Sequence, residues 1–298
     1  MRKLILSFFI FPVFCQAQQL EQFSHYWTIP AFYNPGACGN KNVMSASLIT
    51  RKQWTGYDGS PFGTSFVGDY TFSEKKFSLG LISGYDQIGF YKTFETRFQA
   101  GYHFTSSANL KVSIGLESSF TNFRTVNPNW VMNQPDPSVP SGSTNDYGFQ
   151  MGTGIYLSNQ NFFSGLSVRQ LLATKYKNAN ITLSPHYFLS GGYNFGFYTM
   201  MLTPSVFVES DGTSTQIAAN ANLLLNDKIG FGMGYRLNDA VILNLNYNFQ
   251  RWKIGYAYDI TTSVIQYYSR GSHEVFVSWR IPHINEWKLV VEKKVVFL

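Results

Sequence analysis

Residues 229–236 read Ile-Gly-Phe-Gly-Met-Gly-Tyr-Arg, so large apolar residues alternate strictly with glycine or a charged residue. Successive side chains of a β-strand point to opposite faces, and this period of two therefore predicts a strand with one apolar face and one small or polar face. The same alternation recurs from Phe94 to Phe104, from Leu110 to Phe120 and from Val241 to Phe249. The chain beyond residue 17 is therefore expected to be all-β.

The length of the alternating runs separates two kinds of β-protein. Most runs last roughly 9 to 13 residues, which is closer to the ~9 to 11 residues that cross a bilayer as a tilted strand than to the ~5 to 6 of globular sheets. The predicted strands are Asn42–Trp54, Phe62–Phe72, Lys76–Tyr85, Lys92–Thr105, Leu110–Arg124, Tyr147–Ser158, Asn161–Gln170, Ser184–Phe195, Tyr198–Val208, Thr213–Leu225, Lys228–Arg236, Ala240–Phe249, Arg251–Asp259 and Gly271–Arg280.

The connections between these strands alternate in length. Very short turns follow the even-numbered strands, whereas long segments such as Thr125–Asp146, Leu171–Leu183 and Ile260–Arg270 follow odd-numbered ones. Outer-membrane barrels have an even strand count, short periplasmic turns and long external loops. The sequence thus predicts a closed antiparallel transmembrane β-barrel of about 14 strands over residues 42–280, with both chain ends on the periplasmic side. A soluble β-sandwich, which also alternates, stays the alternative.

The composition agrees with a surface that meets lipid. Charged residues make up 13% of the chain and aromatic residues 17%, against ~25% charged residues in ordinary soluble domains. Intrinsic disorder is excluded by the 44% hydrophobic content. Outside the N-terminus no run approaches the ~20 apolar residues of a membrane helix. Scattered basic residues do not indicate nucleic-acid binding, and five isolated histidines show no metal-ligand spacing, so we expect no cofactor.

Three segments lie outside the predicted barrel. Residues 1–17 combine Arg2-Lys3, an apolar core and a final Ala17, which is typical of an export signal peptide. Residues 18–41 carry Pro30, Asn34-Pro35 and several aromatic residues, so we expect them to plug the barrel or to dock a periplasmic protein. Residues 281–298 are expected to form a periplasmic C-terminal tail.

Two elements near the N-terminus carry a resemblance to a known family. They are Asn-Pro-Gly-Ala-Cys-Gly at residues 34–39 and Arg-Lys-Gln-Trp-Thr-Gly-Tyr-Asp-Gly-Ser-Pro at residues 51–61. Together they resemble the PorP/SprF family, whose members carry NPA-x-x-G followed by R-x-Q-W-x-G-x-x-G-x-P; Gly36 stands where the family often has alanine. Further matches reach Gly271-Ser272-His273-Glu274, so the resemblance covers nearly the whole chain after the signal.

The resemblance implies a non-enzymatic outer-membrane barrel of the type IX secretion and gliding machinery of Bacteroidota. Such a protein either anchors the complex through periplasmic secretion-system proteins or assists the secretion and attachment of a surface adhesin. The partners it implies are thus outer-membrane lipid, periplasmic machinery and a secreted adhesin. An outer-membrane solute channel is the alternative.

The candidate partner-binding residues follow from these motifs and from the external loop. They are Asn34, Pro35, Arg51, Gln53, Trp54, Gly56, Gly59, Pro61 and Trp130. Glycine permits positive φ and proline restricts its own φ, so the segment from Gly56 to Pro61 is expected to be a rigid turn. By alternation, Arg51 and Gln53 face the lumen and Trp54 faces the opposite side.

Alternation also places charged side chains inside the barrel. The predicted lumenal charges are Glu95, Arg97, Lys111, Glu117, Arg236, Asp259 and Glu274. Because a buried charge needs a partner, we expect Arg51 to pair with Glu95 or Glu117. His273 and Glu274 are adjacent in one strand and point to opposite faces, so they are not expected to form a catalytic pair.

Overall fold

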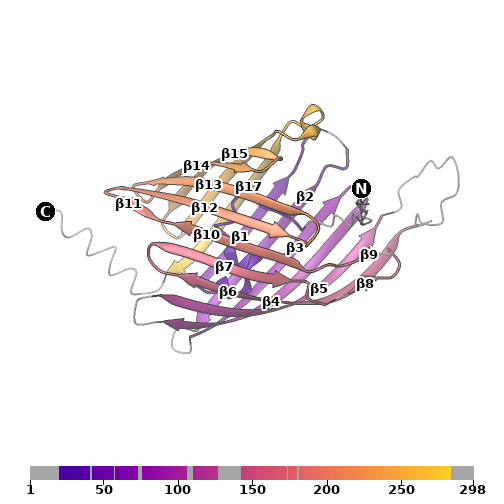
Figure 1. Ribbon diagram of the computed structural model, residues 1–298, viewed down its shortest axis with the longest axis horizontal. Helices are drawn as coiled ribbons and strands as arrows, with labels where there is room; N and C mark the ends of the chain where they lie inside the picture. The colour runs from indigo at the N-terminus through magenta and orange to yellow at the C-terminus, as the bar shows by residue number, and fades with distance from the viewer. Residues whose placement is uncertain are drawn as a thin grey trace, which may run out of the picture.

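Antiparallel strands close into a fourteen-strand cylinder in the computed structural model (Figure 1). The structure describes residues 20–40, 42–56, 58–72, 76–105, 110–126, 142–172, 174–179 and 181–282. The strands of the cylinder are β1 (Asn42–Lys52), β2 (Phe62–Phe72), β3 (Phe77–Ile88), β4 (Tyr91–Thr105), β5 (Lys111–Thr125), β6 (Thr144–Ser158), β7 (Phe162–Arg169), β10 (His186–Tyr193), β11 (Phe195–Phe197), β12 (Met200–Ser210), β13 (Thr215–Leu225), β14 (Ile229–Arg236), β15 (Ala240–Phe249), β16 (Trp252–Thr261) and β17 (Ser272–Pro282).

Strands adjacent in the sequence are also adjacent in the sheet, and two pairings close it. The first strand, β1, pairs with the last, β17, and β10 pairs with both β7 and β12. The short β11 continues the line of β10 beside β12, so the two occupy one place in the barrel. Closure supplies each strand with two hydrogen-bonding neighbours, which is the condition for a sheet to span lipid.

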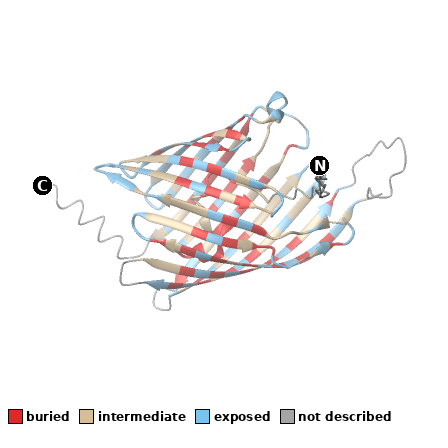
Figure 2. Ribbon diagram, in the orientation of Figure 1, coloured by how far each residue is buried: buried red, intermediate tan, exposed pale blue. Residues whose placement is uncertain are grey.

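Residues that alternate in the sequence lie alternately inside the barrel, where they are buried, and on its outer surface, where they are exposed (Figure 2). On β14, Phe231, Met233 and Tyr235 are exposed on the outer surface, whereas Gly234 and Arg236 are buried. Outward apolar side chains such as Leu116, 58% exposed, recur on the other strands and form the surface that meets lipid. Among the described residues, no helix is long and apolar enough to cross a membrane.

The predicted strands and the observed strands differ mainly at their ends. β1 ends at Lys52 rather than at Trp54, which adopts a positive φ of 49°. The segment predicted as the loop Leu171–Leu183 contains a two-strand hairpin, β8 (Lys175–Tyr176) and β9 (Ile181–Thr182), which pairs outside the barrel sheet. A one-turn 3-10 helix, η3 (Val264–Tyr267), lies in the long connection between β16 and β17.

Residues 20–40, which we call the plug, lie inside the cylinder. The plug contains a short helix, α1 (Pro30–Tyr33), and a 3-10 turn, η1 (Pro35–Ala37). Its aromatic residues form the main buried cluster of the described chain together with inward residues of the strands; the members from the plug include Phe23, Tyr26, Phe32 and Tyr33. The hydrophobic core of this protein is therefore the lumen of its barrel.

The plug crosses the lumen from one end to the other. Leu20 lines one cavity together with Trp54 and Ser263 of the long connections, whereas Asn40 bonds to Ser158, the last residue of β6, beside a short turn. With short turns on the periplasmic side, the plug begins near the external mouth. Residues 20–22 thus lie at the end of the barrel opposite the short turns, and the periplasmic position of the two chain ends stays a prediction. Residues 1–19 and 283–298, including the predicted signal peptide and nearly all of the predicted tail, lie outside the described residues.

Candidate functional site: the plugged lumen and its outer vestibule

A buried ion-pair network holds the upper part of the plug, the part near the long loops. Arg51 Nη2 on β1 lies 2.7 Å from Asp259 Oδ2 on β16, and Arg51 Nη1 lies 3.3 Å from Glu274 Oε2 on β17. Arg236 on β14 reaches the same Asp259 oxygen at 3.0 Å. The predicted pairing of Arg51 with Glu95 or Glu117 is wrong, because those carboxylates lie on strands farther around the cylinder.

The plug completes this network with its own backbone and side chains. Ser24 Oγ donates to Asp259 Oδ1 at 2.8 Å, and the backbone N–H groups of Ser24 and His25 donate to the two oxygens of Glu274 at 2.6 and 2.9 Å. His25 Nδ1 lies 2.7 Å from Glu274 Oε1. A carboxylate that accepts several short hydrogen bonds in a buried site binds the donating segment tightly. Glu274 therefore fixes the plug to the barrel wall.

A second network lies across the lumen on β4, β5 and β7. Arg169 Nε lies 3.0 Å from Glu117 Oε1, and Arg169 Nη2 lies 3.1 Å from Glu95 Oε2. Arg97 Nη1 lies 3.5 Å from Glu117 Oε2 and donates to the Phe32 carbonyl of the plug at 2.6 Å. The Arg97 guanidinium also stacks over the Phe32 ring, 4.3 Å from its centroid. This network thus holds α1 as the first holds Ser24 and His25.

The motif residue Asn34 joins the plug to β6 and β7. Asn34 Oδ1 accepts from Gly36 N at 2.8 Å and so caps η1, while Asn34 Nδ2 donates to the Ile155 carbonyl at 2.9 Å. A Cβ atom at Gly115 or Gly154 would overlap the backbone of Pro35 or the side chain of Asn34, respectively. Glycine at these two strand positions therefore allows the Asn-Pro turn to lie directly on the barrel wall.

The lower end of the plug is closed in the same manner. Ser78 Oγ donates to the Cys38 carbonyl at 2.8 Å, and Lys111 Nζ donates to the Asn40 carbonyl at 2.7 Å. The Cys38 side chain has no exposed surface, and burial, with a smaller contribution from Asp69, raises the pKa of its thiol to about 12. Cys38 is therefore a neutral, packed thiol at neutral pH.

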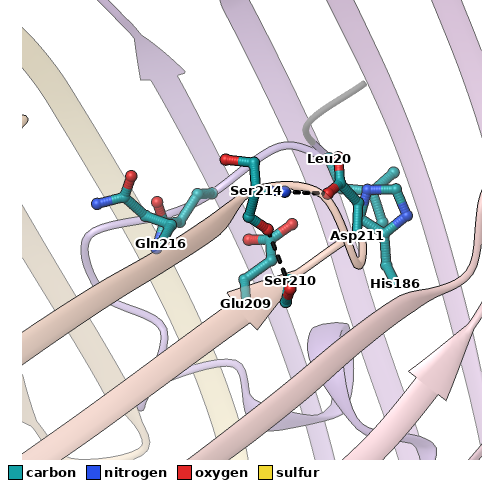
Figure 3. A pocket seen from close by; sticks show the side chains of 8 residues that line it. Leu20, His186, Glu209, Ser210, Asp211, Ser214 and Gln216 are labelled. Atoms are coloured by element: carbon teal, nitrogen blue, oxygen red, sulfur yellow. Dashed lines mark hydrogen bonds between the residues drawn. The ribbon is translucent and has the colours of Figure 1, made fainter. Parts of the chain in front are cut away.

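Above the plug, the described residues at the external end of the lumen line three cavities, which together we call the outer vestibule. Two of them, of about 400 and about 520 Å³, are both lined by Glu21 and Asp86. The third, of about 20 Å³, is lined by Gln22 of the plug and Glu209 on β12, among others; Figure 3 shows Glu209 together with Leu20, His186 and Asp211 around it. All three share Leu20, so the first residues of the plug divide the vestibule.

The vestibule brings together part of the predicted partner-binding set. Arg51, Gln53, Trp54 and Pro61 all line the 520 Å³ cavity. Trp54 was predicted to lie opposite Arg51, but alternation does not extend past Lys52, where β1 ends. Gly56 and Gly59 have positive φ values of 122° and 80° in the adjoining turn, which any other residue would adopt with strain.

The remaining predicted partner-binding residues lie elsewhere. Asn34 and Pro35 are buried within the barrel, and Trp130 lies outside the described residues. A partner-binding role for the whole set stays a prediction. The acidic residues Glu21, Asp86 and Glu209 were not predicted as site residues; for the strand residues Asp86 and Glu209, inward alternation was the available signal.

The described residues contain no cluster of metal-ligating side chains, and His273 and Glu274 lie on opposite sides of β17. No group of three or more histidine, cysteine, aspartate or glutamate side chains in the described ranges is arranged to hold a metal ion. Glu274 is buried while its neighbour His273 bonds to Tyr256 Oη at 2.6 Å on the outer side of the strand, as alternation predicted.

A closed cylinder with an apolar outer belt, a polar lumen and short turns at one end defines an outer-membrane β-barrel protein. The sequence match is more specific than the fold. The family model described as "Type IX secretion system membrane protein PorP/SprF" matches residues 15–279, and the chain belongs to this family.

Solved structures agree on the barrel fold. The outer membrane protein Omp33 of Acinetobacter baumannii matches with a TM-score of 0.50 at 9% identity, over 82% of this chain and 100% of that chain. The CymD monoaromatic hydrocarbon channel matches with a TM-score of 0.50 at 12% identity, over 85% of this chain and 92% of that chain. At these identities the likeness shows the fold alone. No curated protein matches the sequence.

Proposed function

We propose that this protein is a non-enzymatic component of the type IX secretion and gliding machinery that works as a plugged barrel. Its outer vestibule receives an exported surface protein, such as an adhesin, and assists its secretion or attachment. Its periplasmic end meets other secretion-system proteins and anchors the complex. Membership in the PorP/SprF family supports the machinery role.

The observation that carries the proposal is the way the plug is held. Residues 23–40 fill the bore and bond to both ion-pair networks, so an open path would remove the hydrogen bonds that the plug makes to Glu274, Asp259 and Arg97. A hydrogen bond to a charged group contributes about 1.5–3 kcal/mol, and the plug makes several of them. This favours a closed barrel over the alternative, a solute channel.

Planar-bilayer recordings test the distinction. The purified full chain is expected to be electrically silent, whereas a variant lacking residues 20–38 is expected to conduct because the bore is then empty. Steady open-channel conductance of the intact chain would support the channel and reject the plugged barrel.

A second experiment tests the machinery role. Crosslinked co-purification from the native outer membrane is expected to recover secretion or motility components together with the intact protein, and loss of the gene is expected to remove a surface protein from the cell exterior. Recovery of no such component, with an unchanged set of surface proteins, would reject the role.

A further inference from the structure

The outer vestibule carries more carboxylates than its basic groups neutralise. Each of the four buried arginines, Arg51, Arg97, Arg169 and Arg236, is bonded to a carboxylate of the two networks. Three acidic side chains around the start of the plug belong to none of the ion pairs found in the described ranges; they are Glu21, Asp86 and Glu209. A cationic group that enters such a cleft favours the ionised form of its carboxyl groups, against the burial that disfavours it.

Glu21 and Asp86 lie next to one another over β2 and β3. A Cβ atom at Gly63 would overlap the Glu21 carboxylate, and Gly63 is the register partner of Asp86. Glu21 Oε2 accepts only a long bond from Ser65 Oγ, at 3.4 Å, and Glu21 Oε1 is buried without a hydrogen-bond partner in the described structure. Both residues border both large cavities.

On the opposite wall of the barrel, Glu209 is likewise an acidic side chain with a buried oxygen that lacks a hydrogen-bond partner in the described structure. Its side chain is 6% exposed and lines the small cavity beside Gln22, and Figure 3 shows it projecting from β12 toward that space. Glu209 Oε1 accepts no hydrogen bond from the described residues. The guanidinium groups of Arg169 and Arg236 attract it electrostatically, but both are bonded to other carboxylates. A buried carboxylate oxygen left without a donor marks a place for a donor from outside.

The neighbouring walls are aromatic and apolar, and access is from outside the cell. The 400 Å³ cavity is lined by Phe32 of the plug and by Tyr85, Tyr91, Phe123 and Tyr176 of the strands and hairpin. The plug closes the periplasmic side of this space, whereas residues of the connections at the external end, such as Pro61 and Asn238, border the adjoining cavity. An occupant must therefore combine cationic and aromatic groups and enter from the external mouth.

We propose that the outer vestibule binds a basic segment of an exported polypeptide, with lysine or arginine side chains donating to Glu21, Asp86 and Glu209 and aromatic side chains packing in the 400 Å³ cavity. This inference rests on the proposed function, because it names the chemistry of the partner that the vestibule receives. Ammonium and guanidinium groups supply the donors that the three carboxylates lack.

The test is calorimetric titration of the detergent-solubilised full chain with the peptide acetyl-Lys-Tyr-Lys-Tyr-amide. We expect binding that weakens at high ionic strength and that falls on the order of tenfold in the double variant Asp86→Asn/Glu209→Gln, since two charged contacts are lost. The matched control is Asp227→Asn, which removes a carboxylate from a short turn at the other end of the barrel and is expected to change nothing.

Three results would overturn the inference. They are equal binding of acetyl-Glu-Tyr-Glu-Tyr-amide, unchanged binding of the lysine peptide by the double variant, and no binding of the lysine peptide by the intact chain. Folding of each variant is checked by its heat-modifiable mobility on gels. If peptide binding fails while machinery components still co-purify and the intact barrel stays silent, the proposed function survives and only the ligand class is rejected.

Discussion

Arg51 and Asp259 are 208 residues apart in the sequence and form a 2.7 Å ion pair inside the barrel. The pair joins β1 to β16 across the closing strand β17, and Ser24 of the plug lies between the two side chains, bonded to both. One contact therefore connects barrel closure to seating of the plug. Residue Arg51 belongs to the family motif, and its structural role here is to organise two buried carboxylates.

Replacing Arg51 with methionine is expected to destabilise the barrel by about 3–5 kcal/mol, because Asp259 and Glu274 then stay buried with fewer partners. Urea unfolding followed by heat-modifiable gel mobility measures the change. The control Arg280→Met removes an exposed arginine and should shift stability by no more than about 0.5 kcal/mol. Equal effects of the two substitutions would contradict the network.

Asn34→Ala is expected to destabilise plug docking by about 1–3 kcal/mol, because the cap of η1 is lost and the Ile155 carbonyl loses its side-chain donor. Limited proteolysis of the plug in the folded barrel reports the loss. Asn122→Ala, which removes an exposed contact with Asn145, is the matched control and should leave the plug protected. A plug equally resistant in both variants would show that Asn34 does not hold it.

Cys38 is expected to resist maleimide at pH 8 in the folded protein and to react promptly after denaturation, because burial both shields the thiol and raises its pKa to about 12. Mass spectrometry of the Cys38 peptide gives the extent of labelling. The double variant Cys38→Ser/Asp58→Cys places the thiol in an exposed turn and should label at once. Fast labelling of Cys38 in the folded chain would mean that the plug leaves the bore readily.

Because of its raised pKa, Glu21 is expected to make the seating of the plug depend on pH. Burial first, and the nearby Asp86 second, raise the pKa of Glu21 well above its usual value of 4.5. The folded form therefore holds the proton more tightly than the unfolded form, so the contribution of Glu21 is greatest below pH 4.5 and is lost as the pH rises through the raised pKa. The free energy of unfolding of the wild-type protein, measured as a function of pH, should fall more steeply above pH 4.5 than that of the Glu21→Gln variant. If the free energies of unfolding of the two proteins change with pH in parallel, Glu21 is not the cause of the pH dependence.

Much of the barrel was predictable because the alternation of residue types within each strand reflects the two environments that its faces meet, lipid and lumen. Lipid selects apolar side chains at every second position, and the lumen selects glycine, polar and charged ones, so residues 229–236 alone indicate which side faces which medium. Strand number and the inward position of Glu274 follow from this local rule, and both are confirmed.

The rule fails where alternation stops. Trp54 lies beyond the end of β1 and has a positive φ, so the alternation of side chains along a strand no longer determines which way its side chain points. The plug has no strand periodicity at all, and its course from the external mouth to the short turns depends on contacts with strands from all parts of the sequence.

The sequence by itself determined the class of the fold, the lipid-facing surface and the family, since these follow from a local period and from motifs. Only the tertiary structure decided that Arg51 meets Asp259 and Glu274 rather than Glu95 or Glu117, and that Glu21, Asp86 and Glu209 share one vestibule. The physical reason is that inward side chains around a closed cylinder all satisfy the same periodicity. Their partners depend on strand register, on height within the bore and on the segment that fills it.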